Sequence, residues 1–292
     1  MSAIAGLTLS DAKVQFITYL RQKGRANATI LAYGKDIDQL EDFAKSQGKA
    51  DISQTDTQDI ENFKIFLKND KYTAKSISRK VNSIKSLFRF LKVQGLVEAN
   101  PAQLVTHPKY EISPPRALSR MEYRALRDAC RDDVRLSAII EVLLQTGMRI
   151  GELAGLMIED VDFAKKVSAI RPYQSHDGRS VPLTEAAIKS IEEYLKIRPK
   201  TKEATLFVTK TGNPFLVRNI RTAIDRYYKM AGIKDAKVND LRHTFIIQQL
   251  QAGVPLTYLS KIVGHKRLST TEKYLKMIES KTEKDSIKIE EL

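Results

Sequence analysis

The sequence TGMRIGEL at residues 146–153 is followed, in order, by DLRH at residues 240–243, GH at residues 264–265 and a tyrosine at position 274. Each of these stretches is common by itself. Together they place two arginines, a histidine and a tyrosine in the C-terminal half of a 292-residue chain. Arginine binds phosphate through a planar, charged guanidinium, and tyrosine can form a covalent phosphoester. The set is therefore suited to holding and attacking a phosphodiester.

The composition indicates a polyanionic partner. Lysine and arginine number 49 against 35 aspartates and glutamates, so the net charge is +14 at pH 7. An excess of this size favours nucleic acid ahead of a membrane surface, although a basic protein without such a partner is the alternative. No apolar run approaches the roughly 18 residues of a membrane span, and residues 1–8 lack the features of a secretory signal. We expect a cytoplasmic protein that does not contact a membrane.

Cysteine and histidine usage argues against disulfide and metal chemistry. Cys130 is the only cysteine, so no internal disulfide can form, which fits a reducing compartment. The four histidines and this cysteine show no zinc-site spacing. We therefore predict no metal and no cofactor, and any cleavage of a phosphodiester would have to rely on side chains alone.

Residues 1–106 are predicted to form a compact helical domain, because apolar residues recur at helical spacing throughout. The lysines and arginines lie off the apolar stripe, so this face could follow a DNA backbone or simply be solvated. The predicted helices cover residues 9–20, a segment capped by Thr29 and ended by Gly48, residues 57–67 and residues 73–93.

The segment HPKYEISPPR at residues 107–116 contains three prolines, which favour an extended linker over a helix. After it, residues 117–278 are predicted to form a second, mainly helical domain, and residues 279–292 a tail rich in Lys and Glu. The helices of the second domain are expected over residues 119–129, 134–144, 184–195, 218–231, 240–251 and 256–263.

A small antiparallel sheet is expected within the second domain. Asp177-Gly178 is a hairpin turn signal, residues 206–208 are a further candidate strand, and residues 269–272 read as a capping box that would place Tyr274 on the first turns of a helix. The sheet strands are predicted over residues 161–163, 167–174 and 179–183.

The motifs together resemble those of the tyrosine site-specific recombinases of the Xer and phage-integrase superfamily. The family motif T-G-x-R-x-x-E-L is similar to residues 146–153, and H-x-L-R-H is similar to NDLRH at residues 239–243. The element L-G-H-x-S-x-x-T-T-x-x-Y corresponds to VGHKRLSTTEKY at residues 263–274. The nine-residue step from His265 to Tyr274 is the most specific part of a resemblance that covers nearly the whole chain.

The resemblance implies a mainly α fold. Residues 1–106 would be a helical SAM-like core-binding domain that contacts DNA. Residues 107–116 would be the linker, and residues 117–278 a mostly helical catalytic domain with a small antiparallel β-sheet. Residues 279–292 would be a tail that can dock on a neighbouring protomer.

The resemblance also implies the roles of individual residues. Arg149 and Arg242 would clamp the scissile phosphate, and Tyr274 would attack it to leave a 3′-phosphotyrosyl link and a free 5′ hydroxyl. His265 would hydrogen-bond the phosphate or help to move a proton, and Glu152 would support this region. The partner would be duplex DNA with a specific recombination site, bound by a protein that is monomeric in solution and tetrameric in synapsis, with exchange through a Holliday junction.

Two departures from the family pattern concern proton transfer. Asn239 replaces the first histidine of H-x-L-R-H, while His243 keeps the second one, which we expect to be structural; both are weaker catalytic candidates. The hairpin lysine that the family uses as general acid falls at Gln174, and no lysine lies between residues 167 and 188. Candidate replacements, between which the sequence does not decide, are Lys165, Lys166, Arg171, Arg179 and His176.

The missing lysine motivates an alternative, a DNA-binding protein of the same fold that no longer cleaves. A nicking and closing activity like that of type IB topoisomerases is a second one. The sequence leaves open the target site and the process served, whether Xer-like dimer resolution or the resolution or integration of a mobile element.

Overall fold

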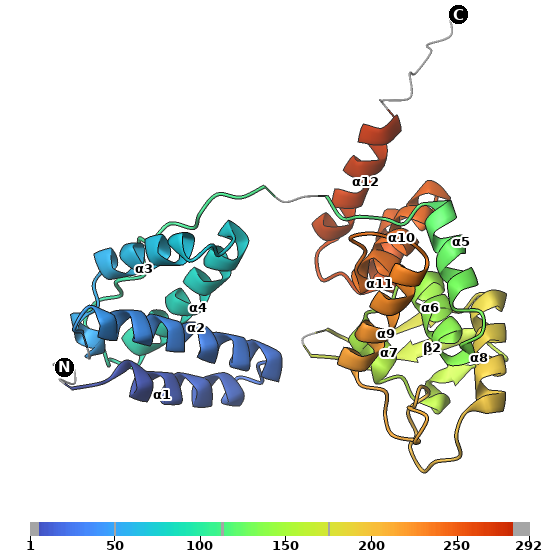
Figure 1. The fold of residues 1–292 in the computed structure, drawn as a ribbon, viewed down its shortest axis with the longest axis horizontal. Helices are drawn as coiled ribbons and strands as arrows, with labels where there is room; N and C mark the ends of the chain where they lie inside the picture. The colour runs from blue at the N-terminus through green and yellow to red at the C-terminus, as the bar shows by residue number, and fades with distance from the viewer. Residues whose placement is uncertain (1–5, 50, 112–113, 175, 283–292) are drawn as a thin grey trace, which may run out of the picture. The chain divides into compact units, whose positions relative to one another are not determined.

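A computed structural model describes residues 6–49, 51–111, 114–174 and 176–282 (Figure 1). The chain divides into two compact units, Met1–Ile112 and Ser113–Leu292. Most of the tail predicted at residues 279–292 lies outside the described residues. Among the helices that the structure describes, none has the length and apolar character that crossing a bilayer would require.

The N-terminal unit is built from four helices whose apolar faces meet in one core that includes Phe16, Ile37, Phe63 and Phe88. A buried carboxylate cross-links two of the helices, because Asp36 accepts hydrogen bonds from Lys80 at 3.0 Å and from Ser83 at 2.6 Å. The helices are α1 (Leu9–Gln22), α2 (Asn27–Ser46), α3 (Thr57–Asn69) and α4 (Ala74–Val93), with a 3₁₀ turn η1 (Ile52–Gln54) after α2.

Local side chains explain where these helices begin. The Thr8 hydroxyl accepts a hydrogen bond from the Asp11 amide, and Thr73 caps α4 in the same way, which satisfies donors that the helix leaves unpaired. The prediction that Thr29 caps the second helix was wrong. That helix starts at Asn27, so Thr29 lies inside its first turn.

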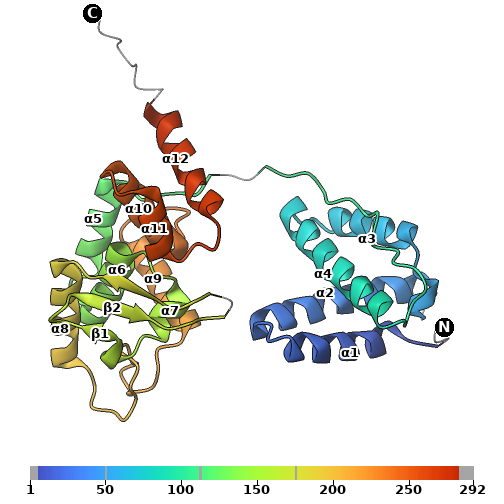
Figure 2. The same cartoon turned by 180° about the vertical axis from the view of Figure 1, so that it is seen from behind.

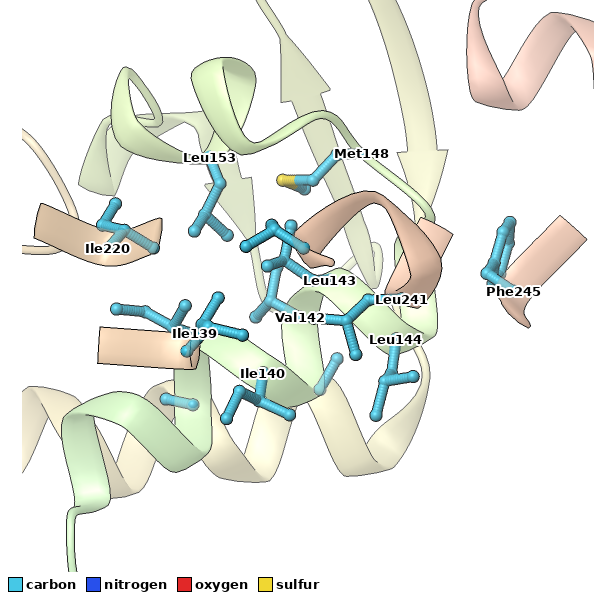
Figure 3. Packing of buried hydrophobic residues seen from close by; sticks show 14 of the residues in the cluster. Ile139, Ile140, Val142, Leu143, Leu144, Met148, Leu153, Ile220, Leu241 and Phe245 are labelled. Carbon is cyan, nitrogen blue, oxygen red and sulfur yellow. The ribbon is translucent and has the colours of Figure 1, made fainter. Parts of the chain in front are cut away.

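The C-terminal unit surrounds a buried helix, α6. Figure 3 shows Ile139, Ile140 and Val142 of this helix packed in the core. The helix is mostly apolar, and its buried Glu141 accepts hydrogen bonds from Arg127 and Gln145. The elements of this unit are α5 (Arg120–Ala129), α6 (Val134–Thr146), α7 (Ile150–Ala154), η2 (Ile158–Asp160), β1 (Val161–Asp162), β2 (Val167–Ile170), β3 (Arg179–Pro182), α8 (Glu185–Ile197), α9 (Val217–Met230), α10 (Val238–Gln251), α11 (Leu256–Val263) and α12 (Leu268–Thr282).

The three strands form an antiparallel sheet in the order β1-β2-β3, with Val167 opposite Pro182 and Ile170 opposite Arg179. Strand β2 ends at Ile170 rather than at residue 174, as Pro172 supplies no amide hydrogen for the ladder. Asp177-Gly178 is consequently not a two-residue hairpin turn, because residues 171–178 form a longer connection. We call these residues the β2–β3 loop.

Two further expectations were wrong. Residues 206–208 form no strand: Val208 makes an isolated bridge with Pro214, and the preceding Thr205 makes another with Met157. Helix α12 begins at Leu268, so the Ser269–Glu272 stretch lies inside the helix instead of capping it. Figure 2 shows α12 beside α10 and α11, and these three helices contact one another in pairs. Tyr274 is carried on α12 and thus faces the same group of helices.

Gly147 ends α6 in a left-handed conformation, with φ of +60°. A Cβ atom there would overlap the ring of Phe245 on α10. This glycine therefore lets the chain turn sharply and lets α10 approach, which places Arg149 two residues later beside α10.

Gly147→Ala is expected to destabilise the protein by about 2–5 kcal/mol, because alanine adds left-handed strain and overpacks the core. Gly155→Ala is the matched control, since its backbone is not left-handed and its nearest contact would be an ordinary 3.6 Å. Equilibrium urea unfolding measures both variants. Equal urea midpoints for Gly147→Ala and Gly155→Ala would show that the close approach of Phe245 to residue 147 does not reduce the stability of the alanine variant.

Candidate active site

Arg149 and Arg242 converge on the turn between α11 and α12. Arg149 Nη2 donates to the carbonyl of Gly264 at 2.9 Å. Arg149 Nη1 and Arg242 Nη2 both donate to the carbonyl oxygen of Val263, at 3.5 and 2.6 Å respectively. Because they share this acceptor, the two guanidinium groups lie close together. The guanidinium groups of Arg149 and Arg242 are thus held at the end of α11, next to His265.

Arg242 is buried, with 7% of its surface exposed, and its Nη1 also donates to the carbonyl of Gly147 at 2.6 Å. Burial lowers the pKa of Arg242 to about 9, and the nearby Arg149 charge contributes in the same direction. The guanidinium stays charged at neutral pH. Burial and the neighbouring positive charge both disfavour the charged guanidinium, so an anion bound beside Arg242 would stabilise it.

Glu152 is the anion that holds this arrangement together. Its carboxylate is 5% exposed and accepts from the Arg149 amide at 2.8 Å, from Arg149 Nη1 at 2.9 Å and from both terminal nitrogens of Arg179 at 2.9 and 2.8 Å. Burial raises its pKa, but the hydrogen bonds and charges of Arg179 and Arg149 outweigh burial and lower it to about 2. One carboxylate facing three arginines leaves the site positively charged, which suits a phosphate.

Glu152→Gln is expected to destabilise the protein at pH 7 by about 3 kcal/mol, because it leaves Arg179 buried without its counter-ion. The carboxylate's contribution is fully present above its unfolded pKa of 4.5 and is lost as pH falls toward its folded pKa of about 2. The difference in unfolding free energy between parent and variant should therefore shrink across that window. Urea unfolding at several pH values tests this, with Glu159→Gln, an exposed partner of Arg171, as control.

Tyr274 is 5% exposed, and its hydroxyl lies 2.8 Å from Nδ1 of His243 on α10. Burial lowers the pKa of His243, so its imidazole is neutral at pH 7 and can accept the phenol proton. Burial also raises the pKa of Tyr274, whereas Arg242 and Arg149 lower it. The phenol is therefore protonated in the free protein, next to a base and within the field of both arginines.

His265 lies beside the same tyrosine. Its ring is nearly parallel to that of Tyr274, at 6.2 Å between centroids, and its Nδ1 is 2.8 Å from the Thr271 hydroxyl. Burial lowers the pKa of His265 to about 3, with Arg242 and Arg149 acting in the same direction. A neutral imidazole can offer a hydrogen bond to a phosphate oxygen but no positive charge. Asn239 is exposed and lies on the first turn of α10.

The candidate general acids are placed very differently. Lys165 and Lys166 lie in the β1–β2 turn, at the opposite end of β2 from the β2–β3 loop, where they pair with Asp162 and Glu185. In the β2–β3 loop Gln174 is exposed, and its amide lies 3.3 Å from the Tyr173 hydroxyl.

The two arginines among these candidates are engaged by carboxylates. Arg171 is bound to Asp160 and Glu159, and Arg179 is bound to Glu152 and the Ile262 carbonyl. His176 lines a cavity of about 640 Å³ whose wall also includes Arg179, His265 and Lys266. Arg179 was considered from the sequence only as a replacement for the general acid, and its pairing with Glu152 was not foreseen. Lys266 was assigned no role from the sequence, although it directly follows His265.

Comparisons with known proteins show which family the chain is similar to. Residues 116–280 match the model of the phage integrase family, and residues 14–95 match that of the phage integrase N-terminal SAM-like domain. Tyrosine recombinase XerC of Natranaerobius thermophilus is 31% identical over 278 residues, which cover 89% of this chain and 92% of the relative. XerC of Herpetosiphon aurantiacus is 29% identical over 272 residues, 89% of this chain and 88% of the relative.

Solved structures show the same fold. XerA recombinase is 27% identical with a TM-score of 0.54, covering 96% of this chain and 99% of that one. The Tn1549 transposon integrase in complex with transposon right end DNA is 19% identical with a TM-score of 0.79, covering 95% and 99%. A lambda integrase tetramer bound to a Holliday junction has 17% identity and a TM-score of 0.74, covering 90% and 78%. With a family model matched over more than half of its length, the chain belongs to the phage integrase family.

Proposed function

We propose that this protein is a tyrosine site-specific recombinase that cuts and rejoins duplex DNA through a 3′-phosphotyrosyl intermediate. The observation that carries the proposal is the placement of the Tyr274 hydroxyl, hydrogen-bonded to a neutral histidine, within the field of Arg149 and Arg242. Family membership supports it, because the relatives named above are recombinases and integrases.

The two arginines would bind the nonbridging oxygens of the scissile phosphate. Arg242 uses one hydrogen of each terminal nitrogen on the Gly147 and Val263 carbonyls, and a guanidinium has five N–H donors. The remaining donors are free to bind the phosphate. Because main-chain carbonyls and Glu152 orient both side chains before DNA arrives, little reorganisation is needed as negative charge grows in the transition state.

Tyr274 would supply the nucleophile. As its oxygen bonds to phosphorus, the phenol proton passes to Nδ1 of His243, which lies 2.8 Å away. The bond from phosphorus to the 5′ oxygen breaks, and that oxygen leaves as a hydroxyl once it is protonated. Rejoining is the reverse reaction: a 5′ hydroxyl attacks the phosphotyrosine, so the reaction needs no ATP.

His265 would donate a hydrogen bond to the phosphate, because Thr271 orients its ring and the imidazole is neutral. Asn239 would add an amide donor in place of the histidine that the family motif carries there. In this proposal residues 1–106 bind DNA as the core-binding domain, residues 107–116 link it to the catalytic domain at 117–278, and residues 279–292 dock on a neighbouring protomer.

The proposed partner is duplex DNA with a specific recombination site in the cytoplasm. Four protomers, monomeric in solution, would synapse two sites and exchange strands through a Holliday junction. The process served would be Xer-like dimer resolution or the resolution or integration of a mobile element. A DNA-binding protein that has lost cleavage is disfavoured, because the nucleophile, both arginines and a proton acceptor are assembled within one site.

The test is to find the DNA that the protein attacks. Purified protein is incubated with fragmented host DNA and denatured, and the covalently attached DNA is sequenced. The proposal predicts recovery of one short recurrent site joined through its 3′ phosphate, with no recovery from Tyr274→Phe protein. Tight DNA binding without any covalent product would support the binding protein instead.

A further inference from the structure

Cleavage needs an acid for the departing 5′ oxygen, since an alkoxide is a poor leaving group in water. Gln174, at the place of the family lysine, has an amide side chain that cannot serve as an acid at neutral pH. We propose that His176 protonates the 5′ oxygen, an inference that rests on the proposed recombinase reaction.

His176 is fixed in position by the β2–β3 loop. Its main chain exchanges two hydrogen bonds with Tyr173, both of 3.0 Å. The Tyr173 ring in turn packs against Gly151 on α7 so closely that a Cβ atom at residue 151 would overlap the ring and its hydroxyl. Because Arg149 begins α7, this contact docks the loop, and His176 with it, beside the phosphate clamp.

The surroundings of the imidazole point to a ligand rather than to a structural role. His176 lines the cavity of about 640 Å³ together with Arg179, His265 and Lys266. Its Nδ1 is buried, and none of the described residues supplies it with a hydrogen-bond partner. Buried polar atoms are nearly always paired in proteins. The His176 side chain therefore lines a cationic cavity and has a ring nitrogen that makes no hydrogen bond to the described residues. It is available to act on a substrate.

The charges that face His176 are those of the active site. Burial lowers its pKa, and the charges of Arg149, Lys266 and Arg242 lower it further, while Glu152 raises it. These groups belong to α7, α10 and the turn after α11. A phosphodiester that binds the arginines brings negative charge into the same field and favours the imidazolium. Binding of DNA would therefore charge the acid at the step that needs it.

Other side chains are less suited. Lys165 and Lys166 lie at the far end of β2, and Arg171 and Arg179 are held by carboxylates. An arginine also keeps its proton too tightly to act as an acid. Lys261 and Lys266 both line the same cavity as His176, and we take Lys266, which directly follows His265, as the rival.

Two duplexes with the cleaved sequence found in the mapping experiment separate these roles. One has the normal 5′ oxygen at the scissile bond, and the other has sulfur there. A thiolate leaves without protonation because the pKa of a thiol is about 8–9. His176→Gln is expected to cleave the oxygen duplex about 10²–10⁴-fold more slowly than the parent and the sulfur duplex at the parental rate. Lys266→Gln, the matched control, should show no such selective rescue.

Other outcomes would contradict either the assignment of His176 or the proposed function. If sulfur does not rescue His176→Gln, or if His176→Gln cleaves the oxygen duplex at the parental rate, the assignment of His176 is wrong. Selective rescue of Lys266→Gln would make Lys266 the acid and overturn the assignment as well. If the parental protein cleaves neither duplex, the proposed recombinase function itself fails.

Discussion

Tyr274→Phe protein is expected to form no covalent link with DNA, and its cleavage rate should fall by roughly five orders of magnitude or more, the scale for losing a covalent nucleophile. The ring stays buried among α10, α11 and α12, so only the hydroxyl and its hydrogen bond to His243 are lost. That loss costs stability of about 1 kcal/mol. Gel analysis of denatured protein–DNA mixtures measures the link, and retention on a DNA affinity column shows that binding persists.

Tyr227→Phe is the matched control. Tyr227 is also buried, and its hydroxyl donates to Asp133 at 3.2 Å, outside the candidate site. This variant should lose comparable stability and keep parental cleavage. Cleavage by Tyr274→Phe protein at a rate near that of Tyr227→Phe protein would remove Tyr274 from the role of nucleophile.

Arg242→Lys protein is expected to cleave about 10²–10³-fold more slowly, the usual effect of removing one oriented donor from a charged transition state. Lysine keeps the charge, but a single ammonium cannot bridge the Gly147 and Val263 carbonyls and still offer a planar pair of donors to phosphate. One buried carbonyl would lose its partner, which costs about 1–3 kcal/mol of stability. Single-turnover cleavage separates this effect from DNA binding.

Arg226→Lys serves as the control for Arg242→Lys. Arg226 is an exposed arginine on α9 that stacks on Tyr227, so the same substitution there alters no proposed catalytic contact. Its cleavage rate should match that of the parent. Parental cleavage by Arg242→Lys protein would show that charge alone is sufficient and that the oriented fork of donors is not used.

The helices could be predicted from local patterns. Helix α11 begins and ends at the predicted residues, Leu256 and Val263, because its apolar period stops at Gly264, which adopts the left-handed conformation with φ of 69°. Thr73 and Ser119 cap α4 and α5 because their hydroxyls accept bonds from amides three residues later. These determinants lie within a few residues of each other and are therefore visible in sequence.

The wrong predictions depended on tertiary contacts. The chain does not reverse at Asp177-Gly178, because Tyr173 pairs with His176 before that dipeptide and packs on Gly151 of α7. Residues 206–208 read as a strand because they are buried apolar residues, but the one bridge among them is the isolated pair of Val208 with Pro214. Neither arrangement leaves a local pattern in the sequence.

In the candidate site, too, some residues could be predicted from local motifs, whereas other contacts depend on the fold. Motif spacing predicted that Arg149, Arg242, His265 and Tyr274 belong to one site. It could not show that Arg179 shares Glu152 with Arg149, since these residues are linked only by the fold. His243 was expected to be structural, whereas its position beside the Tyr274 hydroxyl now makes it the proposed proton acceptor.

The most direct test of the account is mass spectrometry of the protein after it has been trapped on DNA and digested with nuclease and protease. The account predicts one modified peptide, whose added mass is a nucleotide joined through phosphate to the oxygen of Tyr274. A nucleotide on any other residue, or DNA cleavage without a modified peptide, would contradict it.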